Sequence, residues 1–285
     1  MVFFSDEELD RLIAEDVPYF DTTTRLAKFG SRLARIQFYT TDPTVICCTE
    51  EVMRFFSKFN ITPTLVTLSG EFIESDVKFL EAEGLAKHLH TIWRISTNLL
   101  EYASGVATRT RMMVEKAQAI NPHILITATR KTIPYTRKIA AKAVLVGGGN
   151  LNRLSLSENI MFYHNHIKFF GGLENMIKKI DKIKEEAGGR PIAIEASNAD
   201  EALMLSKTNV DIIQLEKIDP DNMSEIIEKI RLSNSNIKIA AAGGINVENV
   251  KAFAKTGVDI IITSFPNHCK PADFRVEIEP LEEYS

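Results

Sequence analysis

The chain has 285 residues, 45% of them hydrophobic and 25% charged, and its formal net charge of −4 argues against nucleic-acid binding as the main function. It contains no apolar run as long as a membrane-spanning helix and no basic signal-peptide start, and its three cysteines lack CxxC spacing. We therefore expect a cytoplasmic protein, in a compartment that keeps thiols reduced, with neither nucleic acid nor membrane as a partner.

The N-terminal part of the chain predicts both helices and strands. Residues 5–15 read as a short amphipathic helix with a capping box, because Ser5 is followed three positions later by Glu8. Residues 16–25, with a proline, read as a loop. The segment 33–80 combines β-rich stretches with one helical stretch. We expect strands at 33–40, 44–51 and 62–68, and a helix at 50–60.

Long helical stretches are expected over residues 85–119, with an interruption near Ser104 and Gly105. After residue 122 the pattern becomes regular, and short apolar runs alternate with amphipathic helical stretches such as 175–189 and 246–257. These runs do not alternate in polarity, which is typical of strands buried on both faces. Six strands are expected, at 123–129, 159–165, 191–197, 210–216, 237–243 and 258–264.

Strands that alternate with helices predict a parallel sheet of right-handed βαβ units. Six units fit either an open doubly wound sheet or a shortened barrel. Polar residues follow every one of the six strands, and a barrel would bring all of these positions to one mouth. We therefore favour an α/β fold with an N-terminal α+β sandwich domain (1–108) and a shortened six-stranded (β/α) barrel (109–270). The alternating tail is expected to return to the N-terminal domain as a strand (271–285).

Two stretches of this barrel are candidates for binding anions. Gly243 and Gly244 lie between an apolar strand and a helical stretch, where backbone N–H groups can approach a phosphate. Ser264 ends the last strand and could contact the same phosphate. Arg130 and Lys131 end the first strand, where two cations suit a phosphate or carboxylate. The alternatives are a tight strand-to-helix turn and an exposed basic turn.

Two carboxylates, Glu195 and Glu216, each follow apolar strand residues. Strand interiors usually exclude carboxylates, so at a barrel mouth they could hold Mg²⁺ or act on a sugar ring. An ion pair with a neighbouring cation is the alternative. His164 and His166 fit hydrogen-bonded loop positions better than metal ligation.

Several of these stretches together resemble the quinolinate phosphoribosyltransferase (nicotinate-nucleotide pyrophosphorylase) superfamily. The match covers almost the whole chain, and the ending ITSFPNHCKPADFRVEIEP is closest to the ModD branch, whose members are named pyrophosphorylases and are associated with molybdate transport. The stretches that carry the resemblance are EDVPYFDTTT (15–24), WRISTNLLEYASGVAT (93–108), TRKTIP (129–134), GGGNLNR (147–153), NH (165–166), IEA (194–196) and GGI (243–245).

The resemblance implies a role for each matching residue. Lys131, Glu195 and Glu216 would act on the ribose and diphosphate of phosphoribosyl pyrophosphate (PRPP), with Mg²⁺ carried by PRPP at the two glutamates. Gly243, Gly244 and Ser264 would hold the 5′-phosphate. Arg130 and Arg153 would bind an anionic acceptor. The family assembles as homodimers with shared active sites, so Arg94 would complete the site of a neighbouring subunit.

The chain also departs from the family pattern. Asn152 stands where the quinolinate enzymes have a histidine, Tyr163 where they have a lysine, Glu216 where they have an aspartate, and Ala242 where they have a serine. In that family the histidine and the lysine help to hold the two carboxylates of quinolinate.

We therefore expect a ModD-like phosphoribosyltransferase or pyrophosphorylase that acts on an anionic nitrogen heterocycle. One alternative is a genuine quinolinate phosphoribosyltransferase of NAD biosynthesis. Two others are a barrel aldolase that forms a Schiff base at Lys217 or Lys131 and a non-catalytic phosphate- or oxyanion-binding protein.

Overall fold

The computed structural model describes residues 2–268 and 270–281 and separates into two compact units. Unit 1 comprises residues 1–109, 138–147 and 269–285, and unit 2 comprises 110–137 and 148–268. This division differs from the predicted barrel range of 109–270, because residues 138–147 group with unit 1. Cys269 and residues 282–285, the end of the predicted tail strand, lie outside the described residues. Across the described residues, no helix combines the length and apolarity needed to cross a bilayer.

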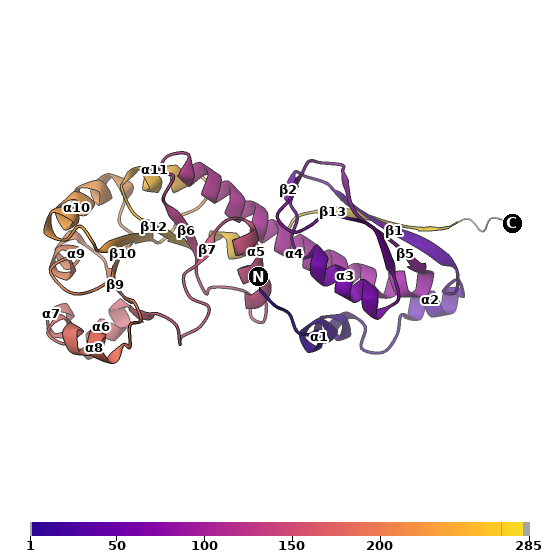
Figure 1. The fold of residues 1–285 in the computed structure, drawn as a ribbon, viewed down its shortest axis with the longest axis horizontal. Helices are drawn as coiled ribbons and strands as arrows, with labels where there is room; N and C mark the ends of the chain where they lie inside the picture. Colours follow the sequence, from indigo (N-terminus) through magenta and orange to yellow (C-terminus); the bar gives the residue numbers. More distant parts are fainter. Residues whose placement is uncertain (1, 269, 282–285) are drawn as a thin grey trace. The chain divides into compact units, whose positions relative to one another are not determined.

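Unit 1 is built on an antiparallel sheet with strand order β13-β1-β5-β3 (Figure 1). Alternate residues of β1 are buried, so one face of the sheet contributes to the core of the unit. The sheet strands are β1 (Leu33–Thr40), β3 (Thr62–Val66), β5 (Lys78–Leu85) and β13 (Phe274–Pro280). The other elements are the strand pair β2 (Thr44–Val45) and β4 (Phe72–Ile73) and the helices α1 (Asp6–Asp16), α2 (Thr22–Ala27), α3 (Thr49–Lys58) and α5 (Arg137–Val146).

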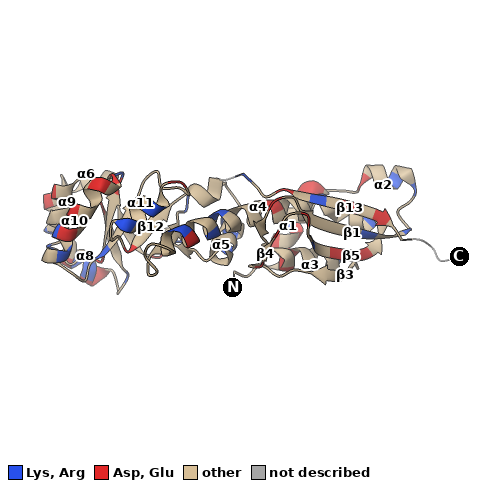
Figure 2. Cartoon of the chain, turned by 90° about the horizontal axis from the view of Figure 1, so that it is seen from above, with Lys and Arg blue, Asp and Glu red and all other residues tan. Residues whose placement is uncertain are grey.

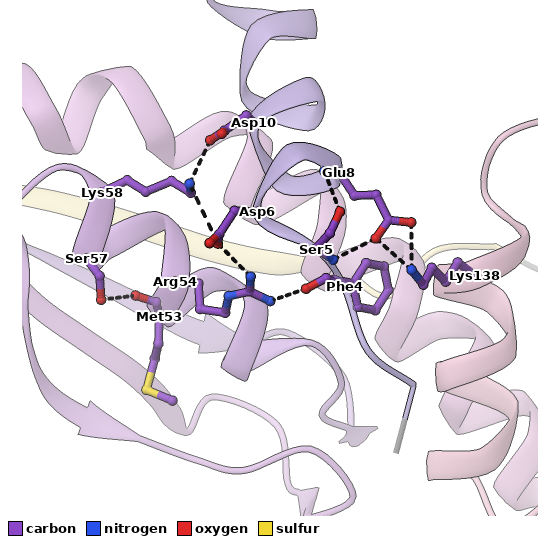
Figure 3. Close-up of polar contacts among 10 residues, drawn as sticks. All are labelled: Phe4, Ser5, Asp6, Glu8, Asp10, Met53, Arg54, Ser57, Lys58 and Lys138. Atoms are coloured by element: carbon purple, nitrogen blue, oxygen red, sulfur yellow. Dashed lines mark hydrogen bonds and ion pairs between the residues drawn. The ribbon is translucent and has the colours of Figure 1, made fainter.

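The capping box predicted for α1 is present. The Glu8 backbone N–H donates to Ser5 Oγ, and the Ser5 N–H donates to the Glu8 carboxylate at 2.7 Å. The same carboxylate accepts two hydrogen bonds from Lys138 of α5 (Figure 3). Glu8 therefore caps the start of α1 and also links this helix to α5, within unit 1.

Three local expectations in unit 1 were wrong. The strand expected at 44–51 is limited to β2 (Thr44–Val45), because α3 already begins at Thr49. Part of the expected loop at 16–25 is the helix α2, which begins where the Asp21 side chain accepts from the Thr23 and Thr24 N–H groups. The expected interruption at Gly105 is absent, because α4 (Ala86–Gln118) is one continuous helix of 33 residues. A Cβ at Gly105 would lie 2.9 Å from the Ala272 nitrogen, so this glycine is there to admit the C-terminal segment and does not break the helix.

Unit 2 is a curled, fully parallel sheet of seven strands, with order β7-β6-β12-β11-β10-β9-β8. Its strands are β6 (Leu125–Ala128), β7 (Asn150–Leu151), β8 (Ile160–Phe162), β9 (Ile192–Ala196), β10 (Ile212–Glu216), β11 (Lys238–Ala242) and β12 (Ile260–Thr263). Its helices are α6 (His164–Phe169), α7 (Leu173–Ile177), α8 (Ile180–Glu186), α9 (Ala199–Leu205), α10 (Pro220–Ser233), α11 (Val250–Lys255) and the 3₁₀ turn η1 (Phe265–His268).

The α/β class and the two predicted sheets are therefore correct, and all six predicted barrel strands are present. The prediction missed a seventh strand, β7, which has only two residues and so leaves almost no pattern in the sequence. β7 and β8 lie at opposite edges of the sheet and do not pair, so the barrel is open between them. Lysine, arginine, aspartate and glutamate are interspersed along the helices of each unit (Figure 2).

Candidate functional site

A cavity of about 800 Å³ opens in unit 2 at the carboxyl ends of its strands. Ten of the eleven predicted site residues line it, and they come from the ends of all seven strands of the sheet or the loops that follow them. These residues are Arg130, Lys131, Asn152, Arg153, Tyr163, Glu195, Glu216, Gly243, Gly244 and Ser264. Ten further residues line the same cavity: Thr129, His164, Asn165, Gln214, Ala242, Ile245, Asn246, Ile262, Thr263 and Phe265.

Glu195 and Glu216 lie on the neighbouring strands β9 and β10. Glu195 is directly opposite Gln214 in the strand register, and Gln214 shares a face with Glu216 because alternate strand residues point to the same side. The Gln214 amide, 6% exposed, donates to Glu216 Oε2 at 3.3 Å. Burial, and secondly the negative charge of Glu216, raise the pKa of Glu195 above its usual value. The charge on Glu216 therefore affects the protonation of Glu195.

This carboxylate pair is suited to a hard cation that brings ligands of its own. Mg²⁺ takes six oxygen ligands and binds through one or two carboxylates plus substrate phosphates. In the described part of the chain, no group of three or more metal-binding side chains gathers. The residues present therefore fit Mg²⁺ bound to a phosphorylated substrate and do not form an all-protein metal cage.

The cationic loop after β6 is held by backbone contacts. Asn267 of η1 donates from Nδ2 to the carbonyl oxygens of Thr129 at 3.0 Å and Lys131 at 3.1 Å. The Lys131 N–H in turn donates to Thr129 Oγ1 at 3.2 Å. These hydrogen bonds position Arg130, which is half-buried, and Lys131, which is exposed, at the cavity. None of them involves the charged end of either side chain.

Arg153 and Tyr163 form a polar contact in the cavity wall. Arg153 is only 8% exposed, and its Nη2 donates to the Tyr163 hydroxyl at 3.3 Å. Tyr163 is held by its N–H, which donates to His166 Nδ1, and by its ring, which stacks on the His166 ring. No carboxylate among the described residues forms an ion pair with Arg153, so its charge is left for a ligand.

The glycine loop after β11 has a constrained backbone. Gly243 and Gly244 have φ angles of +99° and +72°. A Cβ on Gly243 would lie 2.6 Å from Lys217 Cγ and 3.0 Å from the Lys217 nitrogen, so only glycine fits there. The Gly244 carbonyl accepts from Asn249 Nδ2 at 3.1 Å, and Asn249 Oδ1 accepts from the Asn246 N–H at 2.8 Å.

The loop differs in one respect from the expectation. The helix does not follow the glycines directly, because α11 begins only at Val250. An anion bound at this loop would therefore contact backbone N–H groups of the loop and not the N-terminus of a helix. Lys217, one of two candidates for a Schiff base, is exposed and does not line the cavity, whereas Lys131 does.

Arg94 lies apart from these residues, in unit 1. It is exposed, and its guanidinium carbon is 3.9 Å from the centre of the Trp93 ring. It lines a separate cavity of about 550 Å³ together with residues of 16–24. Two stretches that carry the family resemblance therefore meet there. The role of Arg94 in a neighbouring subunit's site stays a prediction.

Gln214 is the main residue that sequence reasoning missed. Its signal was a polar side chain within an otherwise apolar strand, IIQLE, two positions before Glu216. Thr263 was also missed; its Oγ1 donates to the Ile245 carbonyl at 2.6 Å and so anchors the glycine loop to β12. Threonine is common in strands, so Thr263 does not stand out in the sequence as Gln214 does.

Comparison with known proteins agrees with this geometry. Family models of the quinolinate phosphoribosyl transferase N-terminal and C-terminal domains match residues 21–104 and 106–277. The chain is 35% identical over 279 residues to "Putative pyrophosphorylase ModD" of Pasteurella multocida, covering 98% of this chain and 99% of that protein. It is 29% identical to "Probable nicotinate-nucleotide pyrophosphorylase [carboxylating]" of Methanothermobacter thermautotrophicus, covering 95% and 98%.

Solved structures are similar over nearly the whole chain. NadC from Streptococcus pyogenes superposes with a TM-score of 0.87 at 26% identity and covers 97% of both chains. A nicotinate-nucleotide pyrophosphorylase from Ehrlichia chaffeensis, at 24% identity, has a TM-score of 0.89 over 98% of this chain and 100% of that one, which supports the fold.

Proposed function

Because this chain belongs to the quinolinate phosphoribosyltransferase family, we propose that it transfers the phosphoribosyl group of PRPP to a ring nitrogen of an anionic heterocycle, or catalyses the reverse pyrophosphorolysis. The observation that carries the proposal is the cavity of unit 2, which combines two carboxylates, three cations and a glycine loop at one set of strand ends. Each group suits one part of PRPP or of an anionic acceptor.

The proposed reaction forms a bond between the ring nitrogen and C1′ and breaks the bond from C1′ to the diphosphate oxygen, so that pyrophosphate leaves. Positive charge develops on the ribose as the C1′–O bond breaks, and Glu195 and Glu216 stabilise that charge electrostatically. Lys131 neutralises the leaving diphosphate. The backbone N–H groups at Gly243 and Gly244, with Ser264, hold the 5′-phosphate, and Arg130 and Arg153 bind the acceptor. Bound Mg²⁺ would offset diphosphate charge next to the two glutamates.

The cellular setting belongs to the same proposal. We expect a cytoplasmic homodimer in which Arg94 completes the site of the neighbouring subunit. A connection with molybdate transport rests on the ModD name of the relatives.

Pyrophosphate release from PRPP and Mg²⁺, measured with a panel of nitrogen heterocycles, tests the proposal. We expect release that depends on the acceptor. Absence of release with every acceptor, from folded protein that also fails to bind PRPP, would contradict the proposal. Borohydride trapping with keto substrates tests the aldolase alternative.

Glu195→Gln is the variant with the clearest expected effect. It removes the charge that stabilises the ribose, and we expect kcat to fall by about 10²–10³-fold while the unfolding midpoint stays the same. Glu228→Gln is the matched control, because Glu228 is exposed on α10. Full activity of Glu195→Gln would remove Glu195 from the catalytic role.

Quinolinate as acceptor is the second candidate. Its support is the similarity to proteins named nicotinate-nucleotide pyrophosphorylase. Quinolinate-dependent pyrophosphate release would establish it, with Asn152 and Tyr163 tolerated in the acceptor region.

A further inference from the structure

Gln214 is a buried polar residue of β10 that lines the cavity. It lies among apolar neighbours in the strand and is 6% exposed, although glutamine side chains mostly lie at protein surfaces. Burial of an amide costs free energy unless hydrogen bonds replace its lost hydration. The Gln214 amide donates from Nε2 to Glu216 Oε2 at 3.3 Å, and this contact explains how a polar side chain lies at this depth.

The carboxylate of Glu216 has a defined position between β10 and the glycine loop. Its Oε1 would lie 3.2 Å from a Cβ added at Gly243, so this oxygen occupies the space beside the loop. Its Oε2 accepts from Gln214. Among the residues that the structure describes, no other group donates to this carboxylate and no cation pairs with it. The Gln214 amide therefore determines which way the carboxylate faces.

The strand register also places Gln214 beside the second carboxylate. Gln214 is paired with Glu195 of β9 and with Ala240 of β11. Because neighbouring strands lie about 4.8 Å apart, the amide is one strand spacing from Glu195. A neutral donor in this place holds Glu216 without supplying a positive charge. A lysine there would pair with the carboxylates and would compete with a cation that the substrate brings.

We propose that Gln214 is a positioning residue for phosphoribosyl transfer, whose amide holds the Glu216 carboxylate in one orientation beside Gly243 before the substrate binds. This inference rests on the proposed function, because Gln214 acts on the reaction through Glu216. An unheld glutamate side chain samples several rotamers, and ordering it costs free energy in each turnover. Hydrogen-bond partners of metal-binding carboxylates typically contribute about 10–100-fold to metal affinity or activity.

Gln214→Met removes the hydrogen bond and keeps nearly the same side-chain volume. We expect kcat in the pyrophosphate-release assay to fall about 10–100-fold, with little change in KM for PRPP, because the phosphate-binding groups are untouched. The unfolding midpoint should not fall, because an apolar side chain replaces a buried amide. Gln37→Met is the matched control. Gln37 of β1 also donates from Nε2 to a glutamate, Glu81, at 2.7 Å, and its loss should leave activity unchanged.

A double-mutant cycle shows whether Gln214 acts through Glu216. Residues that act as a unit have non-additive effects, so Gln214→Met should lower the residual activity of Glu216→Ala by less than about twofold. In an Arg130→Met background, the same substitution should keep its full effect. Gln214→Asn, which keeps the amide but is one methylene shorter, replaces Gln214→Met if that variant does not fold. Full activity of a folded Gln214 variant, or independent losses in the Glu216→Ala background, would overturn the proposal.

Crystallography tests the orientation itself and requires no turnover. In the unchanged protein we expect one rotamer of Glu216, beside Gly243. In Gln214→Met we expect several rotamers or a carboxylate that has left Gly243, and a single unchanged rotamer would contradict the proposal. Failure of the proposed function is a separate result, seen as absence of PRPP binding and of pyrophosphate release by the unchanged protein. The two crystal structures would still decide whether Gln214 orients Glu216.

Discussion

Individual residues explain why the cavity can be recognised from the sequence. A parallel sheet places the carboxyl ends of its strands at one edge, so polar residues that directly follow apolar runs converge whatever the details of the helices. Glu195 and Glu216 were identified in this way. Gln214 was not, because it lies within the strand and reaches the cavity only through the alternation of side chains on β10. The buried state of Arg153 follows from packing and has no sequence signal.

Gly243 gives a prediction at this scale. Gly243→Ala places a Cβ in contact with Lys217 and forces a left-handed backbone angle on alanine, which costs about 1–2 kcal/mol before any steric clash. We expect the free energy of unfolding to fall by about 2–4 kcal/mol and the affinity for PRPP to fall with it.

Gly70→Ala is the control for this comparison. Gly70 has a similar φ of +103°, yet its added Cβ would meet nothing within 4 Å. Its urea midpoint should therefore report the conformational cost alone. Equal destabilisation of the two variants would show that the contact with Lys217 has no energetic effect.

At the scale of helices and strands, the predictions failed where a strand was very short or where tertiary packing overrode local propensity. The capping box located α1, and the apolar runs located six of the seven parallel strands. β7 was missed because it has two residues, and β5 because its alternating sequence KFLEAEGL leads directly into α4. α4 continues through Gly105 because tertiary contacts override the low helix propensity of glycine.

Gly105→Ala tests that explanation. On propensity alone, alanine would stabilise α4 by about 1 kcal/mol. The added Cβ would instead lie 2.9–3.0 Å from backbone atoms of 270–272, so we expect a lower thermal unfolding midpoint. Asn98→Ala, at an exposed position of the same helix, should raise the midpoint slightly. A stabilised Gly105→Ala would mean that the C-terminal segment moves away at little cost.

The contact between α3 and α5 gives a prediction that depends on pH. Lys142 is 5% exposed and pairs with Glu50 and Glu51 of α3, and Figure 2 shows the basic residues of α5. Burial alone would raise the pKa of Glu50, but hydrogen bonds from Lys142 and Ser69 outweigh it and lower the pKa to about 2. Because this is below the usual value of 4.5, the stabilisation from Glu50 is complete above pH 4.5 and is lost between about pH 4.5 and 2.

Lys142→Met should leave the buried Glu51 carboxylate and the half-buried Glu50 carboxylate without their cation. We expect a loss of about 3–5 kcal/mol at pH 7 and a weaker fall in stability between pH 4.5 and 3 than in the unchanged protein. Urea unfolding across this pH range measures both effects. A Lys142→Met protein with unchanged acid dependence would show that Glu50 keeps its low pKa without Lys142.

On the scale of the whole molecule, unit 1 depends on both ends of the chain. β13 pairs with β1 from Ala34 opposite Pro280 to Thr40 opposite Phe274. Phe274 is 6% exposed, and its ring centre is 4.7 Å from that of Phe79. Deletion of residues 273–285 should therefore expose the edge of β1 and a gap beside Phe79.

We expect this deletion to make unit 1 sensitive to proteolysis and the protein prone to aggregation, as measured by limited proteolysis and size-exclusion chromatography. A deletion of 282–285 alone, which leaves β13 complete, is the control. A monomodal, protease-resistant product from the longer deletion would mean that the other three strands hold unit 1 together.

The position of β13 also has a consequence for biosynthesis. β1 leaves the ribosome about 230 residues before the strand that covers its edge. At roughly 5–20 residues per second, that edge stays unpaired for about 10–50 seconds while unit 2 is still being made. The edge of β1 is therefore open to pairing with another chain during translation, and slower translation of the second half would lengthen that period.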